Sequence, residues 1–210
     1  MSAQLKICGM KIPENIASVV ALEPDYMGFI FYPESKRFVA DLDPEIIRGI
    51  PETIKTTGVF VDEQLEVVKD KITLYQLKAV QLHGKESVGY CAALMATDIE
   101  VIKAFGIDDT FNFDRLDDYY DAVDYFLFDT QTPEHGGSGK AFNWRLLEKY
   151  QLVKPFFLSG GVGLDNVKEL FRINDERLYA VDVNSRFENA PGLKDIDKLV
   201  EFKEQLKVQL

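Results

Sequence analysis

The sequence predicts a single-domain α/β protein built as a parallel, eight-stranded (β/α)8 barrel. Eight short apolar runs, many of them rich in β-branched residues, recur roughly 20–30 residues apart along the 210-residue chain. Amphipathic or polar helical segments fit between the runs, and this alternation is typical of parallel strands joined by crossover helices. Eight such units in this length match a barrel near the lower end of its size range, whereas the alternative, an open doubly wound sheet, usually has about five or six strands. No linker, charge block or low-complexity segment divides the chain, so we expect one domain over residues 1–210.

The expected strands, in chain order, cover residues 5–7, 26–31, 56–61, 79–82, 99–104, 125–128, 156–158 and 179–183. Pro13 and Pro44 stand where first helical turns should begin, because proline is tolerated there, and Asp43 suits the cap of the second of these helices. The last expected helix repeats apolar residues at helical spacing from Ile196 to Leu206, with Lys and Glu on its other face.

Composition and charge argue against several classes of protein. Hydrophobic residues make up 46% of the chain, yet no apolar run approaches the roughly 18 residues of a membrane span. Residues 1–6 lack the apolar core of a signal peptide, and two cysteines, Cys8 and Cys91, make no disulfide framework and suit a reducing cytoplasm. A net charge of −11 argues against nucleic acid and anionic membranes as partners. For the same reason a phosphorylated ligand would need a local group of donors and cations.

The ligand of such a barrel sits at the carboxyl ends of the strands, so the residues directly after each apolar run are candidates for a site. Polar and small residues gather there. In chain order they are Cys8-Gly9-Met10, residues 32–38, Asp62-Glu63, His83-Gly84, Phe105-Gly106, Asp129-Thr130, Ser159-Gly160-Gly161 and Asn184-Ser185-Arg186.

The seventh of these segments suits a phosphate group. The apolar run 156–158 leads into the glycine cluster 159–163, after which apolar residues recur at helical spacing from Leu164 to Phe171. Glycines let backbone N–H groups approach a ligand closely, and the start of a helix adds a partial positive charge. Glycines at a strand–helix junction also serve only to make the bend, and the segment alone leaves both interpretations open.

Cys8 ends the first expected strand, so its thiol should lie at the mouth of the barrel. A thiol with a lowered pKa can act as a base or a nucleophile. Strand alternation puts Lys6 on the same side as Cys8, and we expect Lys6 to face inward, pair with Asp182 on the eighth strand and help to stabilise a thiolate. The alternative is that Cys8 is a small buried hydrophobe, as we expect for Cys91, which lies among helical alanines.

Asp129 follows the apolar run 125–128. Apolar neighbours favour a neutral carboxyl group, which can donate a proton, although a helix cap or a loop carboxylate is an equal interpretation. The segment after it, 130–140, is too long for an ordinary turn, and glycine-rich loops of this length often cover a ligand. His135 lies in this segment, but a histidine in a loop is more often solvated than catalytic.

Arg37, next to Lys36, lies in the segment after the second strand. A guanidinium group matches a carboxylate with two parallel hydrogen bonds, although an exposed cation pair is the alternative. His83 is the other histidine near a strand end. No close cluster of His, Cys and Asp predicts a metal site, and no GxGxxG motif after the first strand predicts a dinucleotide.

Eight motifs along the chain occur in the same order as in a known family. They are Lys6-Ile7-Cys8-Gly9-Met10, Gly28-Phe29-Ile30-Phe31, Ser35-Lys36-Arg37-Phe38-Val39, Gly58-Val59-Phe60-Val61, Val80-Gln81-Leu82-His83-Gly84, Asp129 with residues 136–144, Leu158-Ser159-Gly160-Gly161-Val162 and Val181-Asp182-Val183-Asn184-Ser185. Together they resemble the phosphoribosylanthranilate isomerase family. The match covers every expected strand except the fifth, and the combination is specific, whereas a phosphate cup alone is shared by many barrels.

The resemblance implies the third enzymatic step from chorismate to tryptophan, an Amadori rearrangement of N-(5′-phosphoribosyl)anthranilate to 1-(2-carboxyphenylamino)-1-deoxyribulose 5-phosphate. It implies a TIM barrel of the phosphate-binding type and no cofactor. We expect a cytoplasmic protein, and its oligomeric state, monomer or homodimer, stays open. By the same resemblance Cys8 is the general base, Asp129 is the general acid and Arg37 faces the anthranilate moiety. The backbone of the last two loops, at Gly160, Gly161, Asn184 and Ser185, would hold the phosphate.

Two departures from the family pattern stand out. The family commonly has Ser-Pro-Arg where this chain has Ser35-Lys36-Arg37, so the loop loses a rigid residue. After the eighth strand many members have a glycine at the position of Arg186. We expect Arg186 to add a cation beside the phosphate, and the alternative is that it points to solvent.

Two rival functions remain. The histidine-pathway isomerase performs the same rearrangement on a related aminoaldose, but that family has an aspartate on the first strand where this chain has Cys8. A barrel that only binds a phosphorylated metabolite, as a sensor or an inactive subunit, is the other. The presence of both Cys8 and Asp129 argues against it.

Overall fold

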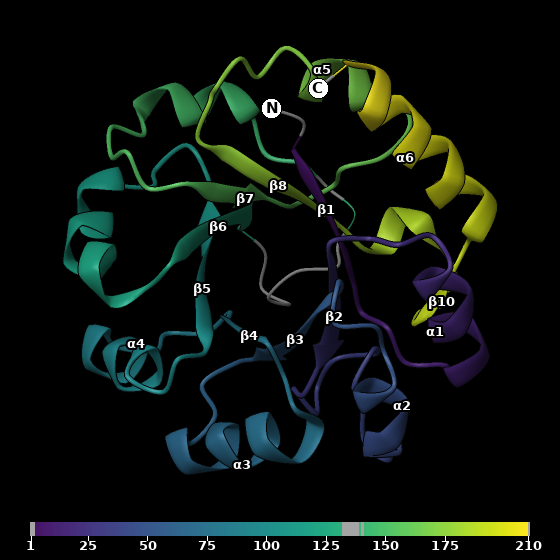
Figure 1. Ribbon diagram of the computed structural model, residues 1–210. Helices are drawn as coiled ribbons and strands as arrows, with labels where there is room; N and C mark the ends of the chain where they lie inside the picture. The colour runs from purple at the N-terminus through teal and green to yellow at the C-terminus, as the bar shows by residue number, and fades with distance from the viewer. Residues whose placement is uncertain (1–2, 132–138, 140, 210) are drawn as a thin grey trace.

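The computed structural model describes residues 3–131, 139 and 141–209, and it shows a closed barrel of eight parallel strands (Figure 1). The strands are β1 (Gln4–Cys8), β2 (Tyr26–Ile30), β3 (Lys55–Phe60), β4 (Ala79–Leu82), β5 (Glu100–Ile107), β6 (Tyr125–Thr130), β7 (Phe156–Leu158) and β8 (Leu178–Val183). Each strand pairs with the next along the chain, and β1 pairs with β8, where Lys6 lies opposite Asp182. The predicted (β/α)8 barrel is therefore confirmed, and the closed sheet excludes the open-sheet alternative.

Helical segments surround the strands on the outside of the barrel (Figure 1). They are α1 (Pro13–Val20), α2 (Pro44–Arg48), α3 (Leu65–Tyr75), α4 (Val88–Met95), η1 (Phe113–Ala122), η2 (Trp144–Lys149), α5 (Val167–Leu170) and α6 (Ile196–Gln209). Pro13 and Pro44 both begin a helix, as expected. The Asp43 carboxylate accepts a hydrogen bond from the backbone N–H of Glu45, so the predicted cap of α2 is also confirmed. In the described part of the chain, no helix is long and apolar enough to cross a membrane.

Some elements differ from the expectation. The segments η1 and η2 are 3-10 helices, and η1 is rich in aspartate and aromatic residues, which are weak formers of α-helix. Strand β5 continues to Ile107, so Phe105 and Gly106 belong to the strand rather than to the loop after it. After β8 a short 3-10 helix, η3 (Ser185–Phe187), leads into an antiparallel pair, β9 (Glu188–Ala190) and β10 (Leu193–Lys194). These strands are too short to leave an alternating pattern that sequence analysis can detect.

Two apolar clusters hold the structure together. The larger cluster joins the outward-facing strand residues to the surrounding helices. The smaller one alternates with it along the strands, so its members face into the barrel: Tyr26, Ala79, Ile102, Ala104, Leu127, Phe157 and Ala180. At the amino-terminal end Tyr26 donates a hydrogen bond from its hydroxyl to Glu100 (2.8 Å), and Lys55 pairs with Glu100 as well. The apolar residues inside the barrel therefore form a filled layer below the carboxyl ends of the strands, where the site is expected.

We expect Phe157→Ala to destabilise the fold by about 3–5 kcal/mol, because it opens a cavity inside the barrel where the ring is fully buried. The ring also packs edge-on against Tyr26 at 5.2 Å between centroids. Val153→Ala, at a side chain that is 76% exposed, is the matched control and should change stability by less than about 0.5 kcal/mol. Urea unfolding of both variants measures the difference, and equal stabilities would contradict the assignment of Phe157 to the barrel interior.

Candidate active site

All seven site residues predicted from the sequence line one cavity at the carboxyl ends of the strands. They are Cys8, Arg37, Asp129, Gly160, Gly161, Asn184 and Ser185. The cavity encloses about 770 Å³ of empty space, part of it open to solvent, and its other lining residues include Gln81, His83, Asp182 and Arg186. Among the described residues no group of three or more His, Cys, Asp or Glu side chains could hold a metal ion. The expected loop residue His135 lies outside the described residues.

Beneath the cavity a buried ion pair crosses from β1 to β8. The Nζ atom of Lys6 lies 2.9 Å from Asp182 Oδ2 and 2.7 Å from Gln81 Oε1, and the Lys6 side chain is fully buried. The predicted Lys6–Asp182 pair is thus confirmed. Burial opposes the ammonium form of Lys6, but the charges of Asp182 and then Cys8 outweigh this effect and raise its pKa.

Cys8 differs from the expectation in its ionisation. Burial, the largest influence, raises the pKa of the thiol, and the neighbouring Lys6 charge lowers it without cancelling that effect. Lys6 thus favours the thiolate as expected, but its charge does not bring the pKa of Cys8 below the ordinary value. A Cβ atom at Gly28 would lie 2.6 Å from Cys8 Sγ, so the glycine on the adjacent strand leaves the space that the thiol fills.

Asp129 lies at the end of β6, close to two donors. The backbone N–H of Thr130 donates to Asp129 Oδ1 (2.7 Å), and His83 Nε2 lies 3.4 Å from Asp129 Oδ2. Gly160 has a φ of +84°, and a Cβ atom there would come within 2.8 Å of Asp129 Oδ1. A glycine at this position therefore allows the seventh loop to pass directly beside the carboxyl group.

A chain of polar contacts joins the two ends of the site. Lys6 can only donate a hydrogen bond, so the side-chain oxygen of Gln81 faces it and the Gln81 amide nitrogen faces His83 Nδ1, at 2.8 Å. His83 Nδ1 is then an acceptor, and a neutral ring carries its proton on Nε2, which points to Asp129. Sequence analysis missed Gln81. The available signal was a polar residue in the middle of an apolar strand.

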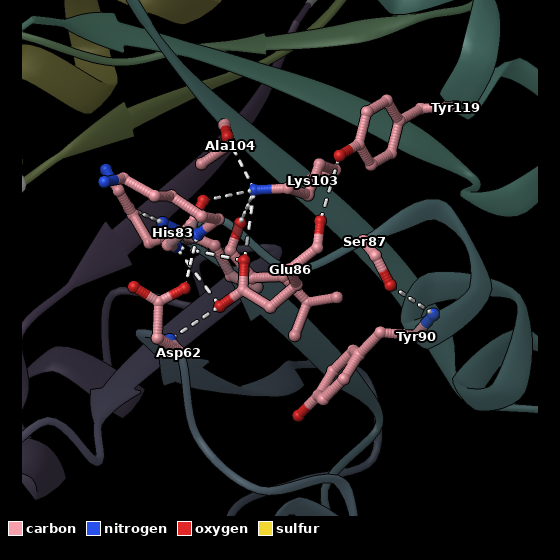
Figure 2. A network of polar contacts seen from close by, with 12 residues as sticks. Asp62, His83, Glu86, Ser87, Tyr90, Lys103, Ala104 and Tyr119 are labelled. Carbon is pink, nitrogen blue, oxygen red and sulfur yellow. Dashed lines mark hydrogen bonds and ion pairs between the residues drawn. The ribbon is translucent and has the colours of Figure 1, made fainter.

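Behind His83 a buried network fixes the backbone on both sides of the ring (Figure 2). Lys103 Nζ lies 3.1 Å from Glu86 Oε2, and both side chains are almost fully buried. Lys103 also donates to the carbonyl groups of Leu82 (3.1 Å) and Gly84 (2.8 Å), and Glu86 accepts from the backbone N–H of Gly84. Lys103 and Glu86 thus provide hydrogen-bond partners for the backbone on both sides of His83, and this segment holds the His83 side chain rigidly.

Arg37 is held by an acidic residue from the segment after β8. Its Nε atom donates to Glu188 Oε1 (2.9 Å), its Nη2 atom donates to Glu188 Oε2 (2.6 Å), and both side chains are largely buried. Lys194 Nζ also lies 2.7 Å from Glu188 Oε1. Burial would raise the pKa of Glu188, but Arg37 and Lys194 together hold it below its ordinary value. Arg37 is therefore not the exposed cation of the alternative interpretation.

The loop before Arg37 keeps a defined turn without proline. The Ser35 hydroxyl accepts a hydrogen bond from the backbone N–H of Arg37 (3.1 Å), and the Ser35 carbonyl accepts from the N–H of Phe38 (3.0 Å). Gly9, with a φ of +80°, lies where a Cβ atom would come within 2.6 Å of the Arg37 side chain. The Ser35 hydrogen bonds thus define this turn although Lys36 stands where the family commonly has a proline, and Gly9 leaves room for the Arg37 side chain.

The glycine cup, formed by residues 159–163 after β7, has the backbone conformation expected of its glycines. Gly160 and Gly161 have φ values of +84° and +65°, and in the described part of the chain no hydrogen bond joins their N–H groups to a protein acceptor. The Asn166 side chain ties the loop together, since it accepts from the N–H of Gly163 (2.9 Å) and donates to the carbonyl of Gly161 (2.8 Å). The expected contribution of a helix start is small, because α5 has one turn and begins only at Val167.

On the other side of the cup, Asn184 and Ser185 begin the segment after β8. The Asn184 side chain accepts a hydrogen bond from Lys194 Nζ (2.7 Å), which connects the cup to the Arg37–Glu188 pair. Arg186 follows and lines the same cavity, so its guanidinium group does not simply point to solvent. The sequence-predicted residues thus come together from the first, second, sixth, seventh and eighth strands.

Comparison with known proteins finds similarity to one family over almost the whole chain. Residues 5–205 match the family model described as N-(5′-phosphoribosyl)anthranilate isomerase. The isomerase of that name from Parabacteroides distasonis is 43% identical over 204 residues, which cover 96% of this chain and 92% of the relative. The one from Thermotoga maritima is 39% identical over 201 residues, or 95% of this chain and 96% of the relative.

Solved structures of such isomerases have the same fold. The crystal structure from Thermus thermophilus is similar with a TM-score of 0.84 at 29% identity, covering 98% of each chain. That from Thermotoga maritima has a TM-score of 0.83 at 37% identity, covering 98% of this chain and 99% of the other. Another is a complex with reduced 1-(o-carboxyphenylamino)-1-deoxyribulose 5-phosphate, with a TM-score of 0.81 at 34% identity and the same coverage. The chain belongs to the N-(5′-phosphoribosyl)anthranilate isomerase family.

Proposed function

We propose that this protein catalyses the Amadori rearrangement of N-(5′-phosphoribosyl)anthranilate to 1-(2-carboxyphenylamino)-1-deoxyribulose 5-phosphate in tryptophan biosynthesis, with Cys8 as the base and Asp129 as the acid. The observation that carries the proposal is that both groups line one cavity, together with a glycine cup suited to a phosphate. The family match over residues 5–205 supports the same reaction.

The first step opens the furanose ring. Asp129 gives its proton to the ring oxygen while the bond from C1′ to that oxygen breaks, and the anilino nitrogen supplies the electron pair that forms a Schiff-base cation. Contacts from Thr130 N–H and His83 Nε2 hold the two oxygens of the carboxyl group in place. A fixed acid beside the leaving oxygen contributes about 10²–10⁴-fold to such a reaction.

The second step moves a proton from carbon. The Cys8 thiolate removes the proton at C2′, and the electron pair moves to the C1′–C2′ bond and neutralises the iminium nitrogen. As the enolamine tautomerises to the ketone, C1′ gains a proton and the C2′ hydroxyl group loses one. Release of the proton from Cys8 and reprotonation of Asp129 restore the enzyme, so the overall reaction is an isomerisation. The Lys6 ammonium group, held by Asp182, lies where it stabilises the thiolate against the effect of burial.

Asp182 offers a further contact to the sugar. Its Oδ2 atom pairs with Lys6, whereas its Oδ1 atom is buried and has no hydrogen-bond partner among the described residues. Asp182 lines the cavity, and a buried acceptor without a partner is costly in free energy. We assign Oδ1 to a hydroxyl group of the ribose chain, which would supply the missing donor.

Arg37 is suited to the carboxylate of the anthranilate ring. Glu188 occupies its Nε and Nη2 atoms, which leaves the Nη1 donors without an acceptor among the described residues. The pair with Glu188 also fixes the plane of the guanidinium group, so less side-chain entropy is lost when a carboxylate binds.

We propose that the chain acts in the cytoplasm as one barrel domain, without a cofactor and without a nucleic-acid partner, as a monomer or a homodimer. A structure of the Thermotoga maritima isomerase concerns monomers generated from a dimeric enzyme, which makes a homodimer a reasonable arrangement to test here.

We expect Cys8→Ser and Asp129→Asn each to lower turnover of phosphoribosylanthranilate by about 10²–10⁴-fold, because each removes one proton-transfer group. Loss of the substrate's fluorescence measures the rate, with no metal or nucleotide added. Cys91→Ser is the matched control, because that buried thiol lies on α4, outside the residues that line the cavity, and it should leave turnover nearly unchanged.

Full activity in Cys8→Ser would remove the proposed base, and full activity in Asp129→Asn would remove the proposed acid. A wild-type protein that binds the substrate without converting it would instead favour the binding-only alternative. Circular dichroism of each variant separates loss of chemistry from loss of the fold.

We expect Arg37→Ala to raise KM by about 10–100-fold with a smaller change in kcat, because a charge-assisted contact to the carboxylate is lost. Arg37→Lys keeps the charge but not the two-point contact with Glu188, and it should recover only part of the affinity. Steady-state kinetics of both variants provide the measurement. An unchanged KM in Arg37→Ala would refute this role.

A further inference from the structure

Arg186 lies across the opening of the glycine cup. Its Nη1 atom donates to the carbonyl of Gly161 (3.1 Å), and its Nη2 atom pairs with Asp165 Oδ2 (2.5 Å). A Cβ atom at Gly163 would lie 2.7 Å from Arg186 Nε, so the absence of a side chain there makes room for the guanidinium group. The guanidinium group of Arg186, which comes from the segment after β8, therefore forms part of the cavity wall.

Arg186 and Arg37 are the two arginine side chains among the described residues that line the cavity, and their acidic partners differ in exposure. Arg37 pairs with Glu188, whose side chain is 4% exposed, whereas Arg186 pairs with Asp165, whose side chain is 64% exposed. Water solvates the exposed Asp165 carboxylate and weakens its attraction for Arg186, so the guanidinium group is able to interact with a second anion in the cavity. This matters in a chain with a net charge of −11.

Arg186 also has donors to spare. A guanidinium group carries five N–H donors, and two hydrogen bonds from Arg186 are seen among the described residues. The cup beside it presents the N–H groups of Gly160 and Gly161, which have no protein acceptor in the described chain. An anion in the cup would thus meet main-chain donors on one side and a guanidinium group on the other.

We propose that Arg186 is a substrate-positioning residue that binds the phosphate dianion directly, while Asp165 holds the guanidinium group at the rim. This inference rests on the proposed function, in that the substrate carries a phosphate. The competing role is that of a clasp, in which Arg186 only ties the segment after β8 to the loop after β7 through Gly161 and Asp165.

The two roles predict opposite effects at Asp165. If Arg186 binds phosphate, then Asp165→Asn removes a competing anion from its guanidinium group, and phosphate binding stays equal or becomes tighter. If Arg186 is a clasp, Asp165→Asn loosens the loop and weakens phosphate binding as much as a change at Arg186 does. The comparison therefore separates direct binding from mechanical support.

Inorganic phosphate is the probe. Its affinity is measured by calorimetric titration and, independently, from the increase of Tm when phosphate is added. We expect Arg186→Gln to weaken phosphate binding by about 10-fold, because it keeps an amide donor for Gly161 but loses the charge-assisted contact. Added sodium chloride should weaken phosphate binding less in this variant than in the wild type. Arg186→Lys, which keeps the charge, should recover part of the affinity.

Unchanged phosphate affinity in Arg186→Gln would overturn the proposal, and so would an equal loss of affinity in Asp165→Asn. Failure of the wild-type protein to bind phosphate at all would overturn it as well. The KM for phosphoribosylanthranilate, measured on the same variants, should follow the phosphate affinity while kcat changes little. A wild-type protein that binds phosphate through Arg186 but does not convert phosphoribosylanthranilate would refute the proposed function and leave this inference in place.

Discussion

The ion pair between Lys6 and Asp182 is the constraint on which the rest of the site depends. Both side chains are buried, so each charge is tolerable only because the other is present and because Gln81 accepts a further hydrogen bond. Apolar residues of similar volume would fill this layer at a smaller cost in desolvation. Within the pair, the Lys6 charge lowers the pKa of the Cys8 thiol, and this effect is larger than the opposing effect of the Asp182 charge.

The same pair sets the orientation of groups on the far side of the cavity. Because the Lys6 ammonium group fixes which end of the Gln81 amide faces it, the orientation of Gln81 and the proton position on His83 follow in turn, and His83 contacts Asp129. The proposed base and acid are therefore positioned by one connected set of contacts, supported from behind by Lys103 and Glu86. A second set, centred on Glu188, holds Arg37 in a similar way.

The barrel could be predicted from the sequence, because strand and helix periodicities are local. The gathering of Cys8, Arg37, Asp129 and the glycine cup at one cavity could be predicted as well, because a closed barrel brings the ends of its strands together. Sequence analysis also predicted the Lys6–Asp182 pair from strand alternation. It missed the raised pKa of Cys8, because exclusion of water depends on packing from strands far apart in sequence. It missed the contact between Arg37 and Glu188 for the same reason, since the two residues are 151 positions apart.

Titration of the Cys8 thiol tests this account most directly. The rate of alkylation, followed against pH in a Cys91→Ala background, reports the pKa of Cys8, and Lys6→Met with Asp182→Asn removes the ion pair as a unit. We expect the midpoint in the protein with the pair to lie above that of an ordinary thiol, and to rise further when the pair is removed, because the stabilising charge is lost while burial remains. A midpoint that does not move, or that falls, would contradict the central role of the Lys6–Asp182 pair.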